Sequence, residues 1–198
     1  SRYPSTVDAL TFSSAGEPTL YEPLGELILA IKDRFRTVPV IVLTNGSLLW
    51  KEQVRSGLLG ADRVVPSLCA ATPEVFRRLH RPHPRLDLEQ IIRGMVAFRQ
   101  EYAGQLHVEV MLVRGINDSR TELEAIAAVL DRIRPDRVEI NTVVRPPADR
   151  MVQAVEPWIL REAAALFAQY HPQVIGSFGT SVVGVTPGNT RERVLELV

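Results

Sequence analysis

The residues best suited to chemistry in this sequence follow short apolar runs, at the points where strands are expected to end. The stretch "SSAGEP" places Ser13, Ser14, Gly16, Glu17 and Pro18 directly after such a run. A glycine lets the backbone approach a ligand closely, and a carboxylate beside it accepts hydrogen bonds from an ammonium group or from hydroxyls. The stretch therefore predicts a site for a small polar ligand, although a surface turn uses the same residues.

Polar residues end the other apolar runs as well. Thr44 and Asn45 open "TNGS", Ser67 opens "SLCAATPE", and Asn141 opens "NTVVRPP". An asparagine side chain both donates and accepts hydrogen bonds, as recognition of a sugar or an amide requires. One such loop alone favours a turn, because "NG" and "ND" are common turn pairs, but several loops on one rim favour a ligand site.

Two expected strands carry a carboxylate in their interior, Glu109 and Glu139. In a barrel, strand residues alternate between the lumen and the helix layer, and a lumen carboxylate with a raised pKa acts as a general base. The other interpretation is an ion-pair partner for Arg114, Arg137 or Arg145. The sequence leaves both interpretations open.

A basic segment, "RRLHRPHPR" at 77–85, holds four arginines and two histidines. It is a candidate for binding phosphate or RNA. Because the net charge of the chain is zero and no aromatic residue is interleaved, a solvated loop with arginines paired to local acids is the alternative. His80 and His83 are three residues apart, but no further ligand is evident beside them, so no metal site is assigned.

The elements that must position these residues alternate along the chain. β-Branched runs predict strands at 7–12, 38–43, 63–68, 106–113 and 137–144. Helices are predicted between them from apolar residues at helical spacing and from capping residues, which are Thr72, Asp87 and the capping box "SRTE" at 119–122. A last helix is expected at roughly 157–169. This order implies parallel strands with right-handed crossovers, and a full barrel, a partial barrel and an open sheet all remain possible.

The composition narrows the classes of protein to which the chain can belong. The chain has 198 residues, with 45% hydrophobic and 23% charged side chains and 23 basic against 23 acidic groups. These values indicate a globular domain, and the balanced charge gives no argument for nucleic acid or an anionic membrane surface. No apolar run approaches the roughly 20 residues of a membrane span, so we expect a soluble, cytoplasmic protein. Phosphate-loop, dinucleotide-binding, Ser-His-Asp and "HExxH" motifs are absent.

The motifs "TFSSAGEPTL", "VPVIVLTNGSLL", "ADRVVPSLCAATPEVFRRLHRPH", "EVMLVRGIND" and "INTVVRPP" resemble the core of the radical S-adenosylmethionine (SAM) enzymes. The resemblance covers residues 6–147 and is closest to the wyosine-type tRNA-modifying synthases and related iron–sulfur oxidoreductases. It implies an α/β fold, a partial (β/α) TIM-like barrel of parallel strands that lacks its first strand. The core would span residues 1–170, with a tail at 171–198 that could hold a short strand and start a further C-terminal domain.

The resemblance also implies a SAM site. The loop from Ser14 to Pro18 would hold the amino group of SAM, with Glu17 accepting from the ammonium and Gly16 allowing close approach. Ser13, just before this loop, is also counted among the cofactor-binding residues. Thr44 and Asn45 would lie near the methionine or ribose part. The residues implied to contact the ribose or the adenine are Ser67, Met111, Val113, Asn141 and Val143.

The family's cluster-binding loop, Cys-x3-Cys-x2-Cys, is absent from this sequence. In the family, three thiolates hold a 4Fe-4S cluster whose electron cleaves SAM. The chain's one cysteine, Cys69, cannot replace them, and we expect it to be a small buried thiol where relatives often carry an aspartate. We therefore expect this chain to be a fragment without radical activity of its own, and the parent protein to bind SAM and the cluster.

The expected partners follow from the same interpretation. The parent enzyme would need an electron donor and a substrate that the sequence does not identify; tRNA is possible but gains no support from the charge. An edge strand at 7–13 would invite dimerisation or aggregation of the truncated chain. Two other functions remain open: a cofactor-free lyase or isomerase using Glu17 and Glu109, and a nucleoside-binding module without catalysis.

Overall fold

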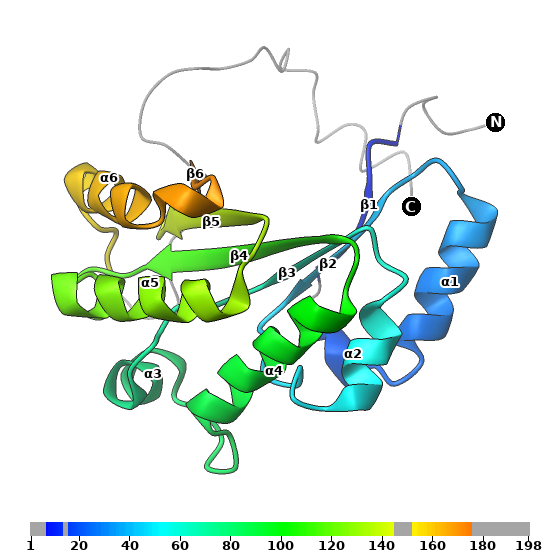
Figure 1. Ribbon diagram of the computed structural model, residues 1–198, viewed down its shortest axis with the longest axis horizontal. Helices are drawn as coiled ribbons and strands as arrows, with labels where there is room; N and C mark the ends of the chain where they lie inside the picture. The colour runs from blue at the N-terminus through cyan, green and yellow to red at the C-terminus, as the bar shows by residue number, and fades with distance from the viewer. Residues whose placement is uncertain (1–6, 14–15, 145–151, 176–198) are drawn as a thin grey trace, which may run out of the picture.

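The computed structural model describes residues 7–13, 16–144 and 152–175. Within these ranges the strands are β1 (Leu10–Phe12), β2 (Val40–Thr44), β3 (Arg63–Pro66), β4 (Gln105–Leu112), β5 (Arg137–Thr142) and β6 (Gln173–Val174). All pairings are parallel, and the strands follow one another in the sheet in sequence order (Figure 1). No pairing of β1 with β6 closes the sheet in this part of the chain. The prediction of an α/β partial barrel is confirmed, and a closed barrel is excluded for these residues.

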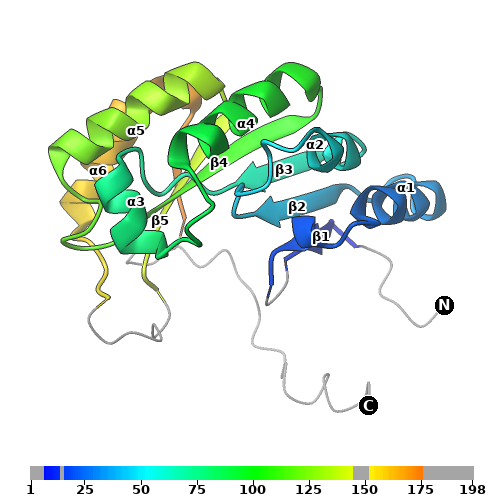
Figure 2. The same ribbon diagram turned by 90° about the horizontal axis from the view of Figure 1, so that it is seen from below.

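Helices connect the strands. They are the 3-10 turn η1 (Pro18–Leu20), α1 (Leu24–Arg34), α2 (Glu52–Leu58), α3 (Pro73–His80), α4 (Leu88–Glu101), α5 (Arg120–Ile133), α6 (Pro157–Leu166) and the 3-10 turn η2 (Ala168–Tyr170). Figures 1 and 2 show α1, α2, α4 and α5 side by side over one face of the sheet. Among the described helices, none is both long and apolar enough to cross a membrane.

The sheet has an outer face under the helices and an inner face with a different composition. Strand residues that point outward are apolar and fully buried, namely Val40, Val42, Val64, Leu106, Val108, Val110, Leu112, Val138 and Ile140. Burying a side chain of this size contributes about 1.5–3 kcal/mol, so this layer supplies much of the folding free energy. Because strand side chains alternate, the inner face takes the intervening residues, which include Arg63, His107, Glu109, Glu139 and Asn141.

A proline interrupts the sheet between β3 and β4. Their regular pairing covers only two residues of each strand, and contact resumes at an isolated bridge between Ser67 and Glu109. The amide of Ser67 donates to β2, while the amide of Leu68 donates to Glu109 in β4. Amides alternate in direction along a strand, so position 66 faces β4, and Pro66 has no N–H to donate there. The gap in the ladder is therefore a direct consequence of the sequence.

Most predicted elements are present with shifted ends. The five predicted strands correspond to β1–β5, and the predicted short strand of the tail is β6. Helix α2 was not predicted, because its seven residues give too short an apolar pattern. The expected final helix ends at Leu166 and continues as η2. β1 lies at the edge of the described sheet, and its pairing with a second chain stays a prediction.

The capping residues act as expected with one exception. Asp87 accepts a hydrogen bond from the amide of Gln90 at 2.8 Å, and Ser119 accepts one from the amide of Glu122 at 3.3 Å. The second half of the predicted capping box is not formed, because the Glu122 carboxylate bonds to residues 71–72 instead. Glu122 thus joins α5 to the loop after β3.

Gly94 in α4 gives the first prediction. A Cβ atom at this position would lie 2.3 Å from the backbone nitrogen of Trp50 and 2.6 Å from the carbonyl carbon of Leu49. We expect Gly94→Ala to lower the free energy of unfolding by about 1–3 kcal/mol or more, because backbone must move to admit the methyl group. Urea unfolding measures the change. Gly16→Ala is the control, since no atom lies within 4 Å of its Cβ position; equal stability of both variants would contradict the prediction.

Candidate functional site

The carboxylate of Glu17 joins the ends of β1 and β2. Its Oε1 accepts hydrogen bonds from the amide of Thr19 at 3.0 Å, the hydroxyl of Thr19 at 2.6 Å and the hydroxyl of Thr44 at 2.5 Å. Its Oε2 accepts one from the amide of Asn45 at 2.7 Å. Glu17 also caps η1, so it fixes the turn after β1 against the last residue of β2. Three donors fill Oε1, whereas Oε2 keeps room for a further donor.

The network continues across the next three strands. The amide of Ser67 donates to the carbonyl of Thr44 at 3.0 Å, and the Ser67 hydroxyl donates to Oε2 of Glu109 at 2.9 Å. The side-chain amide of Asn141 donates to Oε1 of Glu109 at 2.7 Å. A continuous hydrogen-bonded path therefore runs from Glu17 through Thr44, Ser67 and Glu109 to Asn141. We call these five residues the rim network.

The far end of the rim network contains an unsatisfied group. Oδ1 of Asn141 is buried and has no hydrogen-bond partner among the described residues. Leaving a buried acceptor without a donor costs about 1–3 kcal/mol, so such atoms are rare unless a ligand or water supplies the donor. The orientation of the side chain is fixed by Glu109, because only the NH2 group of Asn141 can donate to that carboxylate.

The structure brings most of the predicted site residues together. One open cavity of about 280 Å³ is lined by Ser13, Gly16, Glu17, Pro18, Leu43, Thr44, Asn45 and Ser67. Ser14 lies outside the described residues. The cavity therefore collects residues from three successive strand ends, as parallel strands in sequence order require.

The remaining predicted residues lie on β4 and β5 or just beyond them. Met111 and Asn141 are direct neighbours in the pairing of these strands, and both point to the inner face. Val113 is buried at 1% exposure, and its amide donates to Oδ1 of Asn117, so the described structure does not expose it to a ligand. Val143 follows β5 and is half-buried. These four residues do not line the cavity beside Glu17, and among them Asn141 alone belongs to the rim network.

Sequence reasoning missed Asn117, which holds two strand exits in place. This fully buried side chain donates to the carbonyls of Cys69 and Met111, both at 2.8 Å, and accepts from the amide of Val113 at 2.7 Å. In the sequence it appears only as part of the turn-like "GIND". A buried asparagine whose side chain bonds to distant backbone cannot be distinguished from a turn residue without the fold.

Cys69 is a buried thiol, as expected. It is 5% exposed, and burial raises its pKa to about 12, so the thiolate is not formed at neutral pH. Within the described ranges, no three histidine, cysteine, aspartate or glutamate side chains are grouped as metal ligands. The residues of this chain therefore do not fit the three-thiolate set of a 4Fe-4S cluster.

The two inner-face carboxylates have different partners. Glu109 belongs to the rim network, and Glu139 forms a 2.7 Å hydrogen bond with Nδ1 of the buried His107. The described arginines offered as partners form no ion pair with either carboxylate, since Arg114 pairs with Glu156 and Arg137 donates to Gln173; Arg137 acts on Glu139 only as a nearby positive charge. Arg145 lies outside the described residues. The hydrogen bond from His107 lowers the pKa of Glu139, in spite of the opposing effect of burial.

The fold and the rim network define an α/β partial barrel with an open polar cavity at the carboxyl ends of its strands. The chain belongs to the radical SAM superfamily, whose family model matches residues 8–144. The match covers more than half of the sequence and includes the rim network, so the resemblance seen in the motifs is confirmed.

Curated relatives extend beyond this chain. It is 38% identical over 161 residues to a protein named GTPase Obg from Brachyspira hyodysenteriae, covering 81% of this chain but 24% of that protein. UPF0026 proteins from Helicobacter pylori and Methanocaldococcus jannaschii are 39% and 31% identical over 155 and 183 residues, which are 78% and 92% of this chain. The chain spans 50% and 55% of those two proteins, about half their length.

Solved structures share the fold at low sequence identity. A domain of pyruvate-formate lyase-activating enzyme from Bacteroides vulgatus has a TM-score of 0.66 at 15% identity, over 86% of this chain and 100% of that domain. SuiB from Streptococcus suis, in a structure bound to S-adenosylmethionine, has a TM-score of 0.62 at 15% identity, over 81% of this chain and 38% of that protein. These likenesses support the fold.

The role of Glu17 as a structural joint can be tested by Glu17→Gln. The amide places an N–H group beside donors that require an acceptor, so we expect the free energy of unfolding to fall by about 1.5–3 kcal/mol. Hydrogen exchange at the amide of Asn45 should speed up more than exchange in α5. The control is Glu22→Gln, an exposed neighbour. Unchanged exchange at Asn45 in Glu17→Gln would show that the joint is dispensable.

The Glu139–His107 bond predicts a pH dependence. The pKa of Glu139 is lowered from its ordinary value of 4.5, so ionised Glu139 stabilises the fold above that pH. As the pH falls, the unfolded chain takes up the proton first and this contribution is lost. The gap in unfolding free energy between the protein and Glu139→Gln should be largest near neutrality and shrink toward about pH 3. Parallel urea-unfolding curves at every pH would contradict this, and exposed Glu74→Gln is the control.

Proposed function

We propose that this chain is the SAM-binding core of a radical SAM enzyme. The whole protein would bind SAM and a 4Fe-4S cluster, cleave SAM reductively and so start the modification of a substrate. Membership of the superfamily and the partial barrel support the enzyme core. Three points are proposed: these residues bind SAM, the whole protein binds a 4Fe-4S cluster, and cleaved SAM starts the modification of a substrate.

The cavity beside Glu17 suits the amino acid end of SAM. Oε2 of Glu17 accepts one hydrogen bond, so it has capacity for an ammonium donor, and the 280 Å³ cavity gives access to it. A Cβ atom at Gly16 would meet nothing within 4 Å, so the space next to this backbone is open to a ligand. The carboxylate is already held by four donors, and it would meet the ammonium with little reorganisation.

The unpartnered Oδ1 of Asn141 is the observation that carries the proposal. A ligand that spans the rim from Glu17 would reach this atom with a hydroxyl or amino group, and would satisfy the acceptor that the protein leaves buried. SAM has donors of both kinds, in its ribose and in its adenine. Ser67 and Glu109 would hold Asn141 in the orientation that presents Oδ1 to the ligand.

The cluster would have to be held by residues other than those of this chain, because its one cysteine is buried and protonated. When bound, such a cluster supplies the electron for SAM cleavage. In this proposal the chain's own residues bind and orient SAM. The GTPase name of one relative adds nothing to it, since this sequence has no phosphate-loop motif. The electron donor and tRNA as a substrate stay predictions.

Titration calorimetry with SAM tests the binding site on this chain. We expect Asn141→Leu to weaken SAM binding by at least about tenfold, because it removes the unpartnered acceptor at similar volume. Glu52→Gln, an exposed position on α2 outside the cavity beside Glu17, is the control, and its SAM affinity should change by less than about threefold. Equal SAM affinity of Asn141→Leu and the unmodified chain would refute the site.

The reaction is tested on the full-length protein, reconstituted anaerobically with iron and sulfide and reduced with dithionite. The measured quantity is reductive cleavage of SAM, and residues 1–198 alone, treated identically, are the control and should give none. SAM binding without cleavage by the full-length protein would favour the nucleoside-binding module. Activity on a substrate without iron or reductant would favour the lyase or isomerase.

A further inference from the structure

A second cavity adjoins the proposed SAM site. Its volume is about 250 Å³, and it lies between the loop after β2, the loop after β3 and the α3–α4 connection. It shares Asn45 and Ser67 with the cavity beside Glu17, and the backbone amide of Asn45 donates to Glu17. A molecule bound in the second cavity would therefore lie next to the proposed SAM site.

The second cavity offers no uncommitted charge. Arg81 lines it but already has an interaction partner, and no lining residue is aspartate or glutamate. Nδ1 of His83 accepts a hydrogen bond from the amide of Arg85 at 3.2 Å, which requires an unprotonated nitrogen and therefore a neutral ring. Partial burial lowers the pKa of His80, and burial raises the pKa of Cys69 to about 12, so both side chains are neutral near neutral pH. A buried ion would thus lack a partner to offset its desolvation, whose penalty is several kcal/mol.

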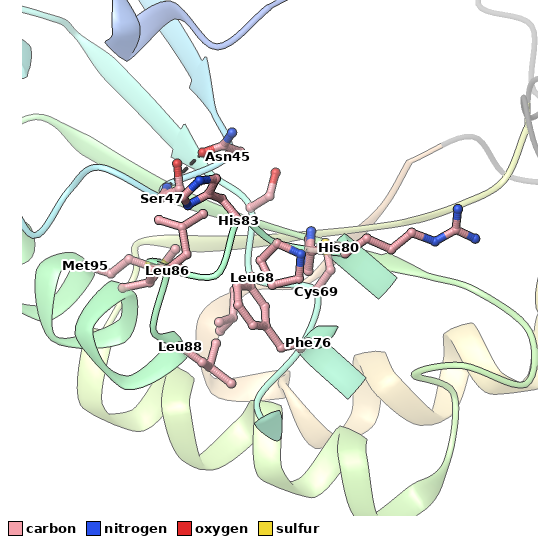
Figure 3. Close-up of a pocket in the computed structure, with 15 residues that line it drawn as sticks. Asn45, Ser47, Leu68, Cys69, Phe76, His80, His83, Leu86, Leu88 and Met95 are labelled. Atoms are coloured by element: carbon pink, nitrogen blue, oxygen red, sulfur yellow. Dashed lines mark hydrogen bonds between the residues drawn. The ribbon is translucent and has the colours of Figure 1, made fainter. Parts of the chain in front are cut away.

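Neutral hydrogen-bonding groups gather at one end of the cavity, where Figure 3 shows Asn45, Ser47 and His83 together. Oδ1 of Asn45 accepts from the amide of Ser47 at 2.8 Å, so its NH2 group is a donor, and it has no partner among the described residues. The neutral ring of His83 carries its proton on Nε2, which is a second donor of this kind. The Ser47 hydroxyl, also without a partner in the described ranges, can donate or accept. This end therefore presents two donors and one hydroxyl.

The opposite end of the cavity is apolar and includes ring surfaces. Its lining residues there are Leu68, Phe76, Leu86, Leu88, Ile91 and Met95. The rings of Phe76 and His80 lie 5.2 Å apart at 45°. An aromatic ligand gains from tilted ring contacts and from contact with a methionine sulfur. A cavity of about 150 Å³ is enough for benzene, so a cavity of about 250 Å³ admits a ring with one substituent.

The polar end is held in place before a ligand binds. The backbone amide and Oδ1 of Asn45 are both hydrogen-bonded within the protein. On the α3–α4 connection, Pro82 and Pro84 restrict the backbone on both sides of His83. A ligand would therefore meet donors that are already oriented, which lowers the entropic cost of binding.

We propose that this cavity binds a neutral aromatic carboxamide, and that the substrate of the enzyme carries such a group. A carbonyl oxygen has two lone pairs and would accept hydrogen bonds from Asn45 and His83, while the amide N–H would donate to the hydroxyl of Ser47. The ring would lie between Phe76 and Met95. The identification of this ligand as the substrate rests on the proposed function, whereas the neutral site stands on its own geometry.

Binding is tested on this chain by NMR titration of the backbone amides with four probes of similar size. Benzamide is the neutral aromatic carboxamide, benzoate replaces it by an anion, benzylamine is a cation without an acceptor, and cyclohexanecarboxamide lacks the aromatic ring. We expect benzamide to bind at least about tenfold more tightly than either charged probe, because the cavity has no uncommitted partner for an ion. It should bind at least about threefold more tightly than cyclohexanecarboxamide, because it alone of the two makes ring contacts.

The amides of Ser47, Cys69 and His83 should shift with benzamide, whereas those of α5 should not. Equal binding of benzoate or benzylamine would overturn the assignment to a neutral carboxamide. Equal binding of cyclohexanecarboxamide would overturn the assignment to an aromatic ligand. Shifts confined to other parts of the chain would refute the site.

His83→Asn tests the polar end of the cavity. Asparagine can accept from the amide two residues on, so the turn at Arg85 is kept while the imidazole Nε2–H is lost. The matched control is His171→Asn, the same change at an exposed left-handed position, φ 47°, outside the cavity lining. We expect benzamide binding to weaken at least about fivefold in His83→Asn and to stay unchanged in His171→Asn. Equal affinity of the two variants would overturn the role of His83.

Phe76→Leu tests the apolar end, because it removes the ring and keeps an apolar side chain. We expect benzamide binding to weaken at least about threefold and cyclohexanecarboxamide binding to stay unchanged. Phe35→Leu, at a half-exposed position after α1, is the control and should change neither affinity. A loss of equal size for both probes in Phe76→Leu would overturn the ring contact.

A parallel SAM titration separates this proposal from the proposed function. Benzamide binding without SAM binding would leave the neutral site intact and refute the SAM core. SAM binding without benzamide binding would refute the neutral site alone. Displacement of benzamide by SAM would place both ligands in one site and overturn the second cavity as a separate one.

Discussion

The rim network is the interaction on which the rest of the site depends. The carboxylates of Glu17 and Glu109 accept hydrogen bonds from residues at neighbouring strand ends. These bonds link the carboxyl ends of β1 to β5 along one edge of the sheet. This is possible because the parallel strands follow one another in sequence order, so each loop finds its partner one strand away. The outer face, with its fully buried valines and leucines, keeps the strands in the register that the network requires.

The network also determines which groups remain for a ligand. The carboxylate oxygens of Glu17 and Glu109 accept hydrogen bonds from other residues of the protein. Their first role is therefore to hold neighbouring strand ends together. Among the described contacts, Oε2 of Glu17 and the two oxygens of Glu109 each accept one hydrogen bond, and Oδ1 of Asn141 accepts none. A site with few unsatisfied groups, held by many satisfied ones, selects a ligand by shape and spacing more than by charge.

The sequence predicted the fold and the location of the site, but not its connections. Apolar alternation and capping residues were sufficient for β1–β5 and most helices, because these signals are local. Glycine, serine, threonine and asparagine at the strand ends located the rim. The partners of Glu122, Asn117 and Glu139 could not be predicted, because each bonds to residues far away in the sequence. Such bonds follow from the packing of elements, which single-residue patterns do not contain.

The gap at Pro66 divides the sheet into two halves that share few backbone hydrogen bonds. On one side lie β1–β3 with Glu17, on the other β4–β6 with Asn141, and few backbone bonds cross between them. Side chains cross where the backbone does not: the Ser67 hydroxyl donates to Glu109, and the Arg63 guanidinium donates to the side-chain oxygen of Gln105. Where Pro66 removes a backbone donor, the union of the two halves is therefore carried by side chains, so it can be altered by substitutions that leave the backbone ladder intact.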